Sequence, residues 1–564
     1  MSVVPSIGDL SLGTAGGSVA PLDPALLDPA LCQTPGMMTH PGLPAAWVWG
    51  VGLSALLIFL WGTLAPARHP HPHRHPSGGL WRAQALRWPA VSAFAAALRA
   101  ALQPLWRTPW LLLALRVVVA ALFLMVIFAG LFGTPIPERN LATVLTWNLW
   151  WTGLVFAVFL VGSAWCAICP WEAIAGWLTR WHAWGRGRAD GSLGWRVPRA
   201  LRGVWPATAM FIALTWLELG LGITTNPYAT ALLALFMVVL ASASALLFER
   251  SAMCRWFCPV GRTVGVYSTL SPVALRPLDP MLCARCETLE CYHGDARIAP
   301  CPTHQVMGRM RDNIDCTSCG NCTQSCPEGN VTWQWRVPGH EAVSTGRPRV
   351  DLAWLMVVLL ALTSFHGLTM MPFWEPTLRG FARLIGDSGQ LLWSFSAALG
   401  LALAVPLGLY ALGVALTRRL LGPQIETRRV FAALAFACLP PAFAYHLAHN
   451  LNHLLRETGD LPALLANPLG RGALPMTEAE HFLYYLNPSL PQGGLFLFQA
   501  VLLVAGLWLA ARIVRRRVDA LIREGGARAT RDATRAPGAP MLGFVTVATL
   551  YHLWLLAHPM VMRM

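Results

Sequence analysis

The sequence CTSCGNCTQSCP at positions 316–327 determines how the one sizeable soluble part of this chain can fold. Its spacing, Cys-x2-Cys-x2-Cys-x3-Cys-Pro, is the run with which bacterial iron–sulfur proteins hold [4Fe–4S] clusters. Three closely spaced thiolates hold one cluster, and the cysteine before proline ligates a second cluster. The run therefore predicts a second set of cysteines nearby.

A looser set of cysteines precedes this run, with the pattern Cys-x2-Cys-x4-Cys followed by a separate Cys-Pro. Exchange of the two Cys-Pro cysteines between the sets gives each cluster four thiolates. The first predicted cluster is then held by Cys283, Cys286, Cys291 and Cys326, and the second by Cys316, Cys319, Cys322 and Cys301. A zinc ribbon is the alternative, but two triples with two Cys-Pro do not fit its paired spacing.

The rest of the chain has the composition of a membrane protein. Of its 564 residues, 55% are hydrophobic and only 12% are charged, and the mean hydropathy is +0.50. This composition excludes a disordered chain, and 14 Cys are too sparse for a secreted disulfide scaffold. Ten segments are long and apolar enough to cross a bilayer, at about 45–66, 110–133, 141–165, 204–222, 229–249, 352–372, 389–416, 429–449, 493–514 and 541–560.

The arginines predict the orientation of these spans. All 42 basic residues are Arg, and 35 of them fall in the loops on one side of the predicted membrane. The positive-inside rule makes that side cytoplasmic and places both termini outside. Because the basic charge follows the topology and favours anionic lipid, we expect no nucleic-acid partner.

We therefore predict an α-helical polytopic protein of a bacterial inner membrane, with about ten transmembrane helices and both termini outside. The predicted domains are a non-cytoplasmic tail at 1–44, a five-helix membrane domain at 45–250, a cytoplasmic segment at 251–350 and a C-terminal five-helix membrane domain at 351–564. The cytoplasmic segment has few apolar runs, so it is expected to be a small α+β unit, similar to a bacterial ferredoxin, that two clusters hold together. Disulfides are disfavoured on the cytoplasmic side.

Two further cysteine pairs are predicted at cytoplasmic ends of helices. They are Cys166-Ala-Ile-Cys169-Pro, which ends the third span, and Cys254-Arg-Trp-Phe-Cys258-Pro, which follows the fifth. Four thiolates at one depth could hold a third metal centre or cycle between dithiol and disulfide. Simple packing is the alternative, since free cysteines are often buried.

These features together resemble the membrane polyferredoxin family of NapH and NosR. Residues 105–345 carry the resemblance, chiefly CRWFCPVG at 254–261 and the eight-cysteine block. The resemblance implies electron transfer between quinol, or a cytoplasmic donor, and a periplasmic redox partner, or support of that partner's maturation. The chain departs from the family in its Cys-x2-Cys-Pro first pair, in lacking a flavin-attachment domain like that of NosR, and in five spans after the cysteine block.

The last five spans carry histidines in their outer halves. The candidates for binding haem b or copper are His366, His446, His449 and His552, and Met370 and Met371 could add soft thioether ligands for copper. A carrier is needed because about 30 Å of hydrocarbon separates the cytoplasmic clusters from the outer side. A bound quinone is another candidate carrier, and Glu218 could take a quinol proton. The alternative for each His is an ordinary hydrogen bond to a neighbour.

The predicted function is that of an inner-membrane iron–sulfur electron-transfer protein. It would pass electrons between quinol or a cytoplasmic donor and a periplasmic acceptor, as a component that serves another enzyme. The alternatives are a copper-linked reductase or copper-handling protein, and a redox-sensing or assembly factor. No catalytic residue is identified from the sequence.

Overall fold

The computed structural model describes residues 39–65, 97, 100, 103–180, 192–387, 389–456, 461–477, 480, 490–525 and 536–561. The expected tail at 1–44 therefore lies mostly outside the described residues. All of the cysteines and histidines predicted to bind a cofactor lie within them.

The chain is a multi-pass helical membrane protein. Within the described residues nine helices are long and apolar enough to cross a membrane: α1 (Ala45–Leu64), α4 (Pro109–Phe132), the run Leu141–Thr179, α9 (Pro227–Leu247), α14 (Val350–Thr369), α16 (Leu392–Leu421), the run Thr427–Arg456, α21 (Gln492–Glu524) and α23 (Ala539–Ala557). The remaining expected span, 204–222, is instead α8 (Trp205–Gly220), with 16 residues. At 1.5 Å per residue α8 is about 24 Å long, which is shorter than a hydrocarbon core of about 30 Å.

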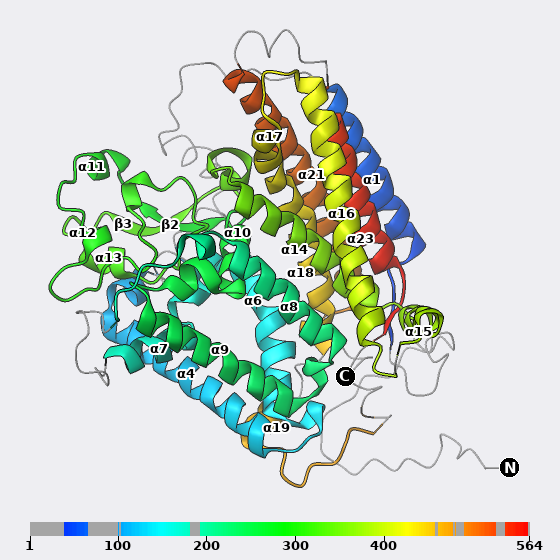
Figure 1. Cartoon of the computed structure of the whole chain (residues 1–564), viewed down its shortest axis with the longest axis horizontal. Helices are drawn as coiled ribbons and strands as arrows, with labels where there is room; N and C mark the ends of the chain where they lie inside the picture. Colours follow the sequence, from blue (N-terminus) through cyan, green and yellow to red (C-terminus); the bar gives the residue numbers. More distant parts are fainter. Residues whose placement is uncertain are drawn as a thin grey trace.

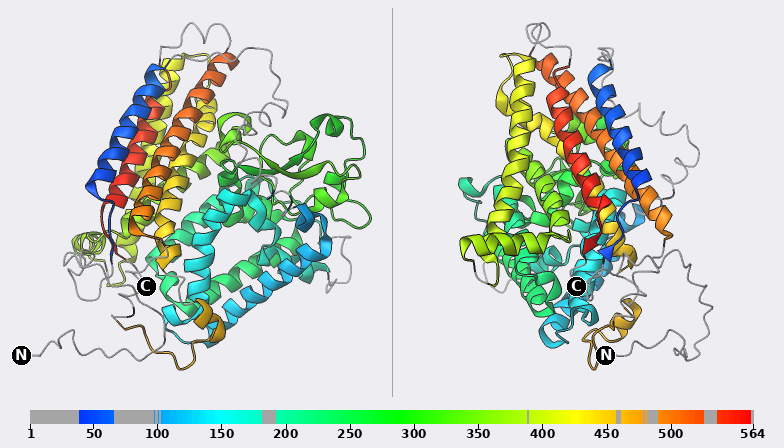
Figure 2. Two further views of the ribbon diagram at one scale, coloured as in Figure 1. Left: turned by 180° about the vertical axis from the view of Figure 1, so that it is seen from behind. Right: turned by 90° about the vertical axis from the view of Figure 1, so that its right-hand side faces the viewer.

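The helices group in space differently from their order along the chain. The first helix, α1, packs against α21 and α23, the last two long helices (Figures 1 and 2). The strands β1 (Thr39–His40) and β4 (Met560–Val561) pair antiparallel, so the two ends of the described chain lie side by side.

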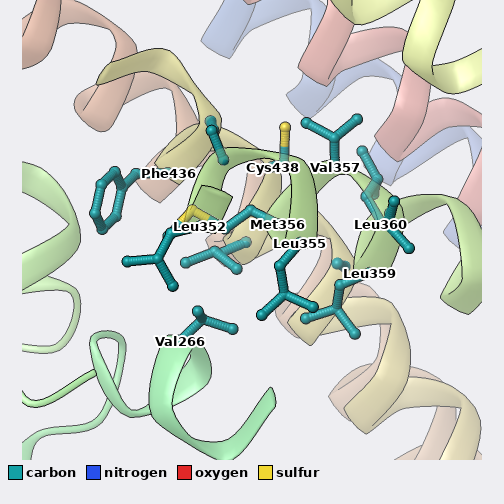
Figure 3. Packing of buried hydrophobic residues seen from close by; sticks show 14 of the residues in the cluster. Val266, Leu352, Leu355, Met356, Val357, Leu359, Leu360, Phe436 and Cys438 are labelled. Atoms are coloured by element: carbon teal, nitrogen blue, oxygen red, sulfur yellow. The ribbon is translucent and has the colours of Figure 1, made fainter. Parts of the chain in front are cut away.

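The helix α14 forms the centre of the molecule. It packs against α8, α16, α17 (Thr427–Leu434), η12 (Ala435–Cys438) and α18 (Leu439–Arg456), and is buried over most of its length. Figure 3 shows α14 residues such as Leu352 and Leu355 between Val266 and Phe436. A helix that is apolar on all sides is expected to be buried in this way.

The helical run that begins with the third expected span, 141–165, extends past it and is interrupted at Gly162. It consists of α5 (Leu141–Thr143), the π-helix η5 (Val144–Trp151), α6 (Thr152–Val161), the 3-10 turn η6 (Gly162–Ala167) and α7 (Pro170–Arg180). The break has two causes. Gly162 adopts a positive φ of 58°, which glycine tolerates best, and Pro170 can only start a new helix.

The cysteine-rich segment is a small α+β unit on one flank of the molecule (Figure 1). Its strands β2 (Val273–Pro277) and β3 (Val331–Trp335) pair antiparallel, with Val273 opposite Trp335. Its helices are η9 (Met253–Phe257), α10 (Pro259–Ser268), α11 (Pro280–Ala284), α12 (Glu290–His293), η10 (Met307–Arg309), α13 (Asn321–Ser325) and η11 (Glu341–Thr345). The remaining elements are η4 (Pro137–Arg139), η7 (Arg199–Leu201), η8 (Ile223–Thr225), α15 (Trp374–Ile385) and α19 (Leu461–Ala466).

Buried polar contacts at Glu341 hold this unit together, and the backbone there connects it to the membrane helix α21. Glu341 is 1% exposed and accepts hydrogen bonds from Arg276, Arg336 and the backbone N–H of Asn313. Burial by itself raises the pKa of Glu341, but the two guanidinium groups bring it below its usual value. The carbonyls of Glu341 and Ala342 in turn accept from the buried Arg517 of α21.

We expect Glu341→Gln to lower the free energy of unfolding by about 3–5 kcal/mol, because two partly buried guanidinium groups lose their buried carboxylate. Thermal or denaturant unfolding in detergent measures this effect. The exposed pair Glu375–Arg379 provides the control, and Glu375→Gln should cost less than about 1 kcal/mol. Equal costs for the two variants would contradict this role of Glu341.

Candidate functional site

The structure brings Cys326 to the first cysteine triple. The residue that joins them is Asn330, whose backbone N–H donates to Sγ of Cys326 at 3.4 Å and whose side-chain amide donates to Sγ of Cys283 at 3.4 Å. Cys283 also lies within electrostatic range of Cys286 and Cys326. The four thiols that the sequence assigned to one cluster therefore occupy one region.

The other four thiols line a single small cavity. Its walls include Cys301, Cys316, Cys319 and Cys322, with Cys291 of the first triple at the edge. Backbone N–H groups point at two of the sulfurs: Gln305 donates to Cys301 at 3.3 Å, and Ser318 donates to Cys316 at 3.4 Å. Hydrogen bonds of this kind stabilise ligating sulfurs in iron–sulfur proteins.

Glycine and a strained serine let the chain wrap around this cavity. Gly320 has a φ of 88° and Ser318 a φ of 49°, both in the left-handed region. The indole N–H of Trp106, which precedes α4, donates to the carbonyl of Ser318 at 2.5 Å. Burial raises the pKa of the Cys316 thiol to about 11 and that of Cys319 to about 12. Thiolates here would therefore need a bound cation, such as a metal, to balance their charge.

The two Cys-Pro pairs of the membrane region also meet. Cys166, Cys169, Cys254 and Cys258 lie within electrostatic range of one another. Cys169 and Cys258 each directly precede the first residue of a helix, Pro170 of α7 and Pro259 of α10. Proline is favoured there because it lacks the N–H that the first turn leaves unpaired.

The first turns of these two helices present N–H groups to the thiols in the same way. The backbone N–H of Gly261 donates to Sγ of Cys258 at 3.2 Å, and the N–H groups of Trp171 and Glu172 face the Cys169 sulfur. Helix N-termini favour negative charge, which is why reactive thiolates often lie there. These four cysteines form a third thiol group. It lies next to the second thiol group (Cys301, Cys316, Cys319 and Cys322), because Cys166 lies within electrostatic range of Cys316.

Sequence reasoning missed two charged residues beside the third thiol group. Glu172, three residues after Cys169, accepts a hydrogen bond from Cys254 Sγ at 3.3 Å and another from the Ser251 hydroxyl. Arg262, four residues after Cys258, is 1% exposed and pairs with Asp315 at 2.5 Å. The available signal was spacing: each of these residues lies about one helical turn after a Cys-Pro cysteine, and residues three or four apart share a helix face.

No three His, Cys, Asp or Glu side chains within the described ranges form a group arranged to hold a single metal ion. The thiols of the three groups instead face a shared region or cavity.

The structure separates the predicted outer histidines into different environments. The rings of His366 and His449 lie 5.3 Å apart, and Nε2 of His449 lies 3.3 Å from Nε2 of His453. His446 instead faces the Tyr267 hydroxyl at 3.5 Å, and His552 bonds the Ser364 hydroxyl at 2.7 Å. His366 therefore joins a histidine row with His449 and His453, apart from the hydrogen-bonded His446 and His552.

A polar cavity of about 520 Å³ adjoins this row. Its lining includes His366, His453, Glu218, Asn450 and Met370. Glu218, on α8, is buried, and its Oε1 lies 3.9 Å from Nδ1 of His366. Met370 and Met371 both belong to the apolar cluster that contains Tyr445 and Leu556.

One known protein resembles part of the chain. Over 117 residues the chain is 32% identical to the "Putative electron transport protein YccM" of Escherichia coli (strain K12). The match covers 20% of this chain and 29% of that protein, so it spans less than a third of the relative's length. No protein-family model and no solved structure matches the chain.

The contact between α10 and the second thiol group provides a stability test. A Cβ added at Gly265 of α10 would lie 2.2 Å from the carbonyl oxygen of Ile314, two residues before Cys316. We expect Gly265→Ala to destabilise the protein by about 1–3 kcal/mol, as other overpacked sites do. Denaturant unfolding, with protease sensitivity of residues 251–349, measures it.

The matched control is Gly176→Ala in α7, where an added Cβ meets nothing within 4 Å. Alanine should stabilise that helix by about 0.5–1 kcal/mol. If Gly265→Ala were equally stabilising, the close approach of α10 to Ile314 would be refuted.

Proposed function

We propose that this chain is an inner-membrane electron-transfer protein that holds two [4Fe–4S] clusters in its cytoplasmic segment. Cys283, Cys286, Cys291 and Cys326 would hold one, and Cys316, Cys319, Cys322 and Cys301 the other. A bound cluster supplies one-electron redox chemistry. The observation that carries the proposal is the double hydrogen bond from Asn330 to Cys283 and Cys326, which lie in different cysteine runs.

The chain's own residues have three tasks in this function. The N–H groups of Ser318, Gln305 and Asn330 hydrogen-bond sulfur, which is one way in which a protein sets the potential of a cluster. The α+β unit buries the second group. Arg517 of α21 holds that unit against the membrane helices through the carbonyls of Glu341 and Ala342.

The electron donor would be quinol or a cytoplasmic protein, and the acceptor a redox partner on the periplasmic side. The similarity to a protein named for electron transport supports the general role. The third thiol group, Cys166, Cys169, Cys254 and Cys258, would be a further redox site between the α+β unit and the membrane interior. The chain would act as a component that serves another enzyme.

Paired cysteine variants test the exchanged ligands. Cys326→Ala and Cys283→Ala should abolish the same electron paramagnetic resonance signal and each halve the iron content, because both thiols serve one cluster. Cys301→Ala and Cys322→Ala should abolish the other signal. The control is Cys438→Ala, since that buried thiol lies in the apolar core, and it should keep both signals. Loss of one signal in both Cys326→Ala and Cys316→Ala would contradict the exchange.

The histidine row favours a second candidate function, in which the outer side binds haem b or copper. His366, His449 and His453 are neighbours, and Met370 lines the same cavity as two of them. Imidazole binds both haem iron and copper, and thioether suits Cu(I).

A reduced-minus-oxidised optical spectrum of the purified protein, with copper analysis, tests this candidate. If haem is bound, sharp bands should appear in the wild-type protein and be absent in His449→Ala. If copper is bound, the metal content should fall in the same variant, while His558→Ala, whose ring hydrogen-bonds the Trp554 carbonyl, should keep it. A spectrum of broad iron–sulfur bleaching, without copper in the protein, would refute this candidate.

A further inference from the structure

A second cavity lies between the third thiol group and Glu218. It has a volume of about 310 Å³ and runs among α4, the π-helix η5, α7, α8 and α9. Its walls are almost entirely apolar, with Phe123, Leu149, Phe211 and Met237 among them. A cavity of this size accepts a small organic ring.

Five tryptophans surround this cavity, and three of them have indole N–H groups with no acceptor. Trp150 lies at the centre of the cluster, with ring centroids 5.7 Å from both Trp165 and Trp171. The indole nitrogens of Trp150, Trp165 and Trp171 are buried and have no hydrogen-bond partner among the described residues. Buried donors nearly always have a partner, so three around one cavity point to a ligand with acceptor oxygens.

The two ends of the cavity differ in chemistry. At one end it is lined by Pro170 and Pro259, the residues that follow Cys169 and Cys258 of the third thiol group. At the other end it is lined by Glu218, Trp147 and Trp151, which also line the polar outer cavity. A ligand here would contact a carboxyl group on one side and lie beside thiols on the other.

The cavity also reaches the surface that faces lipid. Leu122 of α4 is 42% exposed and lines it, so an apolar molecule could enter from the hydrocarbon region. The π-helix η5 carries Trp147, Trp150 and Trp151, and π-helical insertions are frequent at functional sites.

We propose that this tryptophan cavity binds the ring of a lipid-soluble quinone or hydroquinone, with its tail directed past Leu122. The indole N–H groups would donate to the ring oxygens, and Glu218 would accept from a hydroxyl of the reduced ring. A lipid acyl chain fits the site less well, because it offers no oxygen to the three indoles. This inference rests on the proposed electron-transfer function and adds the place where the quinone partner binds.

Substitutions that remove the indole donors test the site. A decyl-substituted benzoquinone is titrated calorimetrically into the full-length protein in lipid nanodiscs, with empty nanodiscs subtracted. Trp150→Phe, Trp165→Phe and Trp171→Phe keep an aromatic ring but remove the N–H. The dissociation constant should rise about fivefold to tenfold in at least two of them, the usual effect of one buried hydrogen bond.

The control variant is Trp393→Phe, on α16, which is 76% exposed and does not line the cavity. It should bind the quinone as the wild type does. Unchanged binding in all three cavity variants would overturn the proposal. So would competition by a simple fatty acid that is equally strong in the wild type and the variants, since the cavity would then be an acyl-chain site.

An azido-benzoquinone provides a second, independent measurement. On illumination it should label peptides from residues 119–171 or 211–237, and labelling confined to other segments would overturn the site. Iron content and cluster signals are recorded for the same samples. Weaker quinone binding with intact clusters supports the cavity, whereas a wild-type protein without iron would refute the proposed function while leaving the binding result readable.

Discussion

The ion pair between the buried Arg262 and the partly exposed Asp315 is the interaction on which the arrangement of the thiol groups depends. Arg262 follows Cys258 by one helical turn, and Asp315 directly precedes Cys316, so the pair joins the third thiol group to the second. Asp315 also accepts from Arg349, which pairs with Asp351 at the start of α14. Removal of Asp315 would leave an uncompensated charge on the buried Arg262, so the connection is costly to break.

The α+β unit depends on elements from other parts of the chain. The α+β unit contributes β2 and β3 and seven short helices, too little apolar surface for a stable core of its own. It is completed by Trp106 ahead of α4 and by Arg517 of α21. Elements from the whole length of the chain thus surround the cysteines, and the unit is best regarded as an extension of the membrane helices.

The interior of the membrane region holds two adjoining cavities of opposite character. The tryptophan cavity is apolar and lies next to the third thiol group, whereas the outer cavity contains carboxylates, imidazoles and amides. Glu218 belongs to both of them. A carboxyl group buried among membrane helices is costly, and such groups usually serve transport or redox chemistry. This placement gives Glu218 more weight than its position in the sequence suggested.

The sequence by itself determined the features that local rules control. Hydropathy identified nine long helices of the described chain, because a span needs a continuous apolar run, and it also selected α8, which is apolar but has only 16 residues. Cysteine spacing predicted which thiols would share a cluster, because a cubane would impose fixed spacings on a short loop. Only the tertiary structure decided what depends on long-range packing. The position of α1 beside α21 and α23, the meeting of His366 with His449 and His453, and the tryptophan cavity all join residues far apart in sequence, and no local pattern encodes which helix faces which.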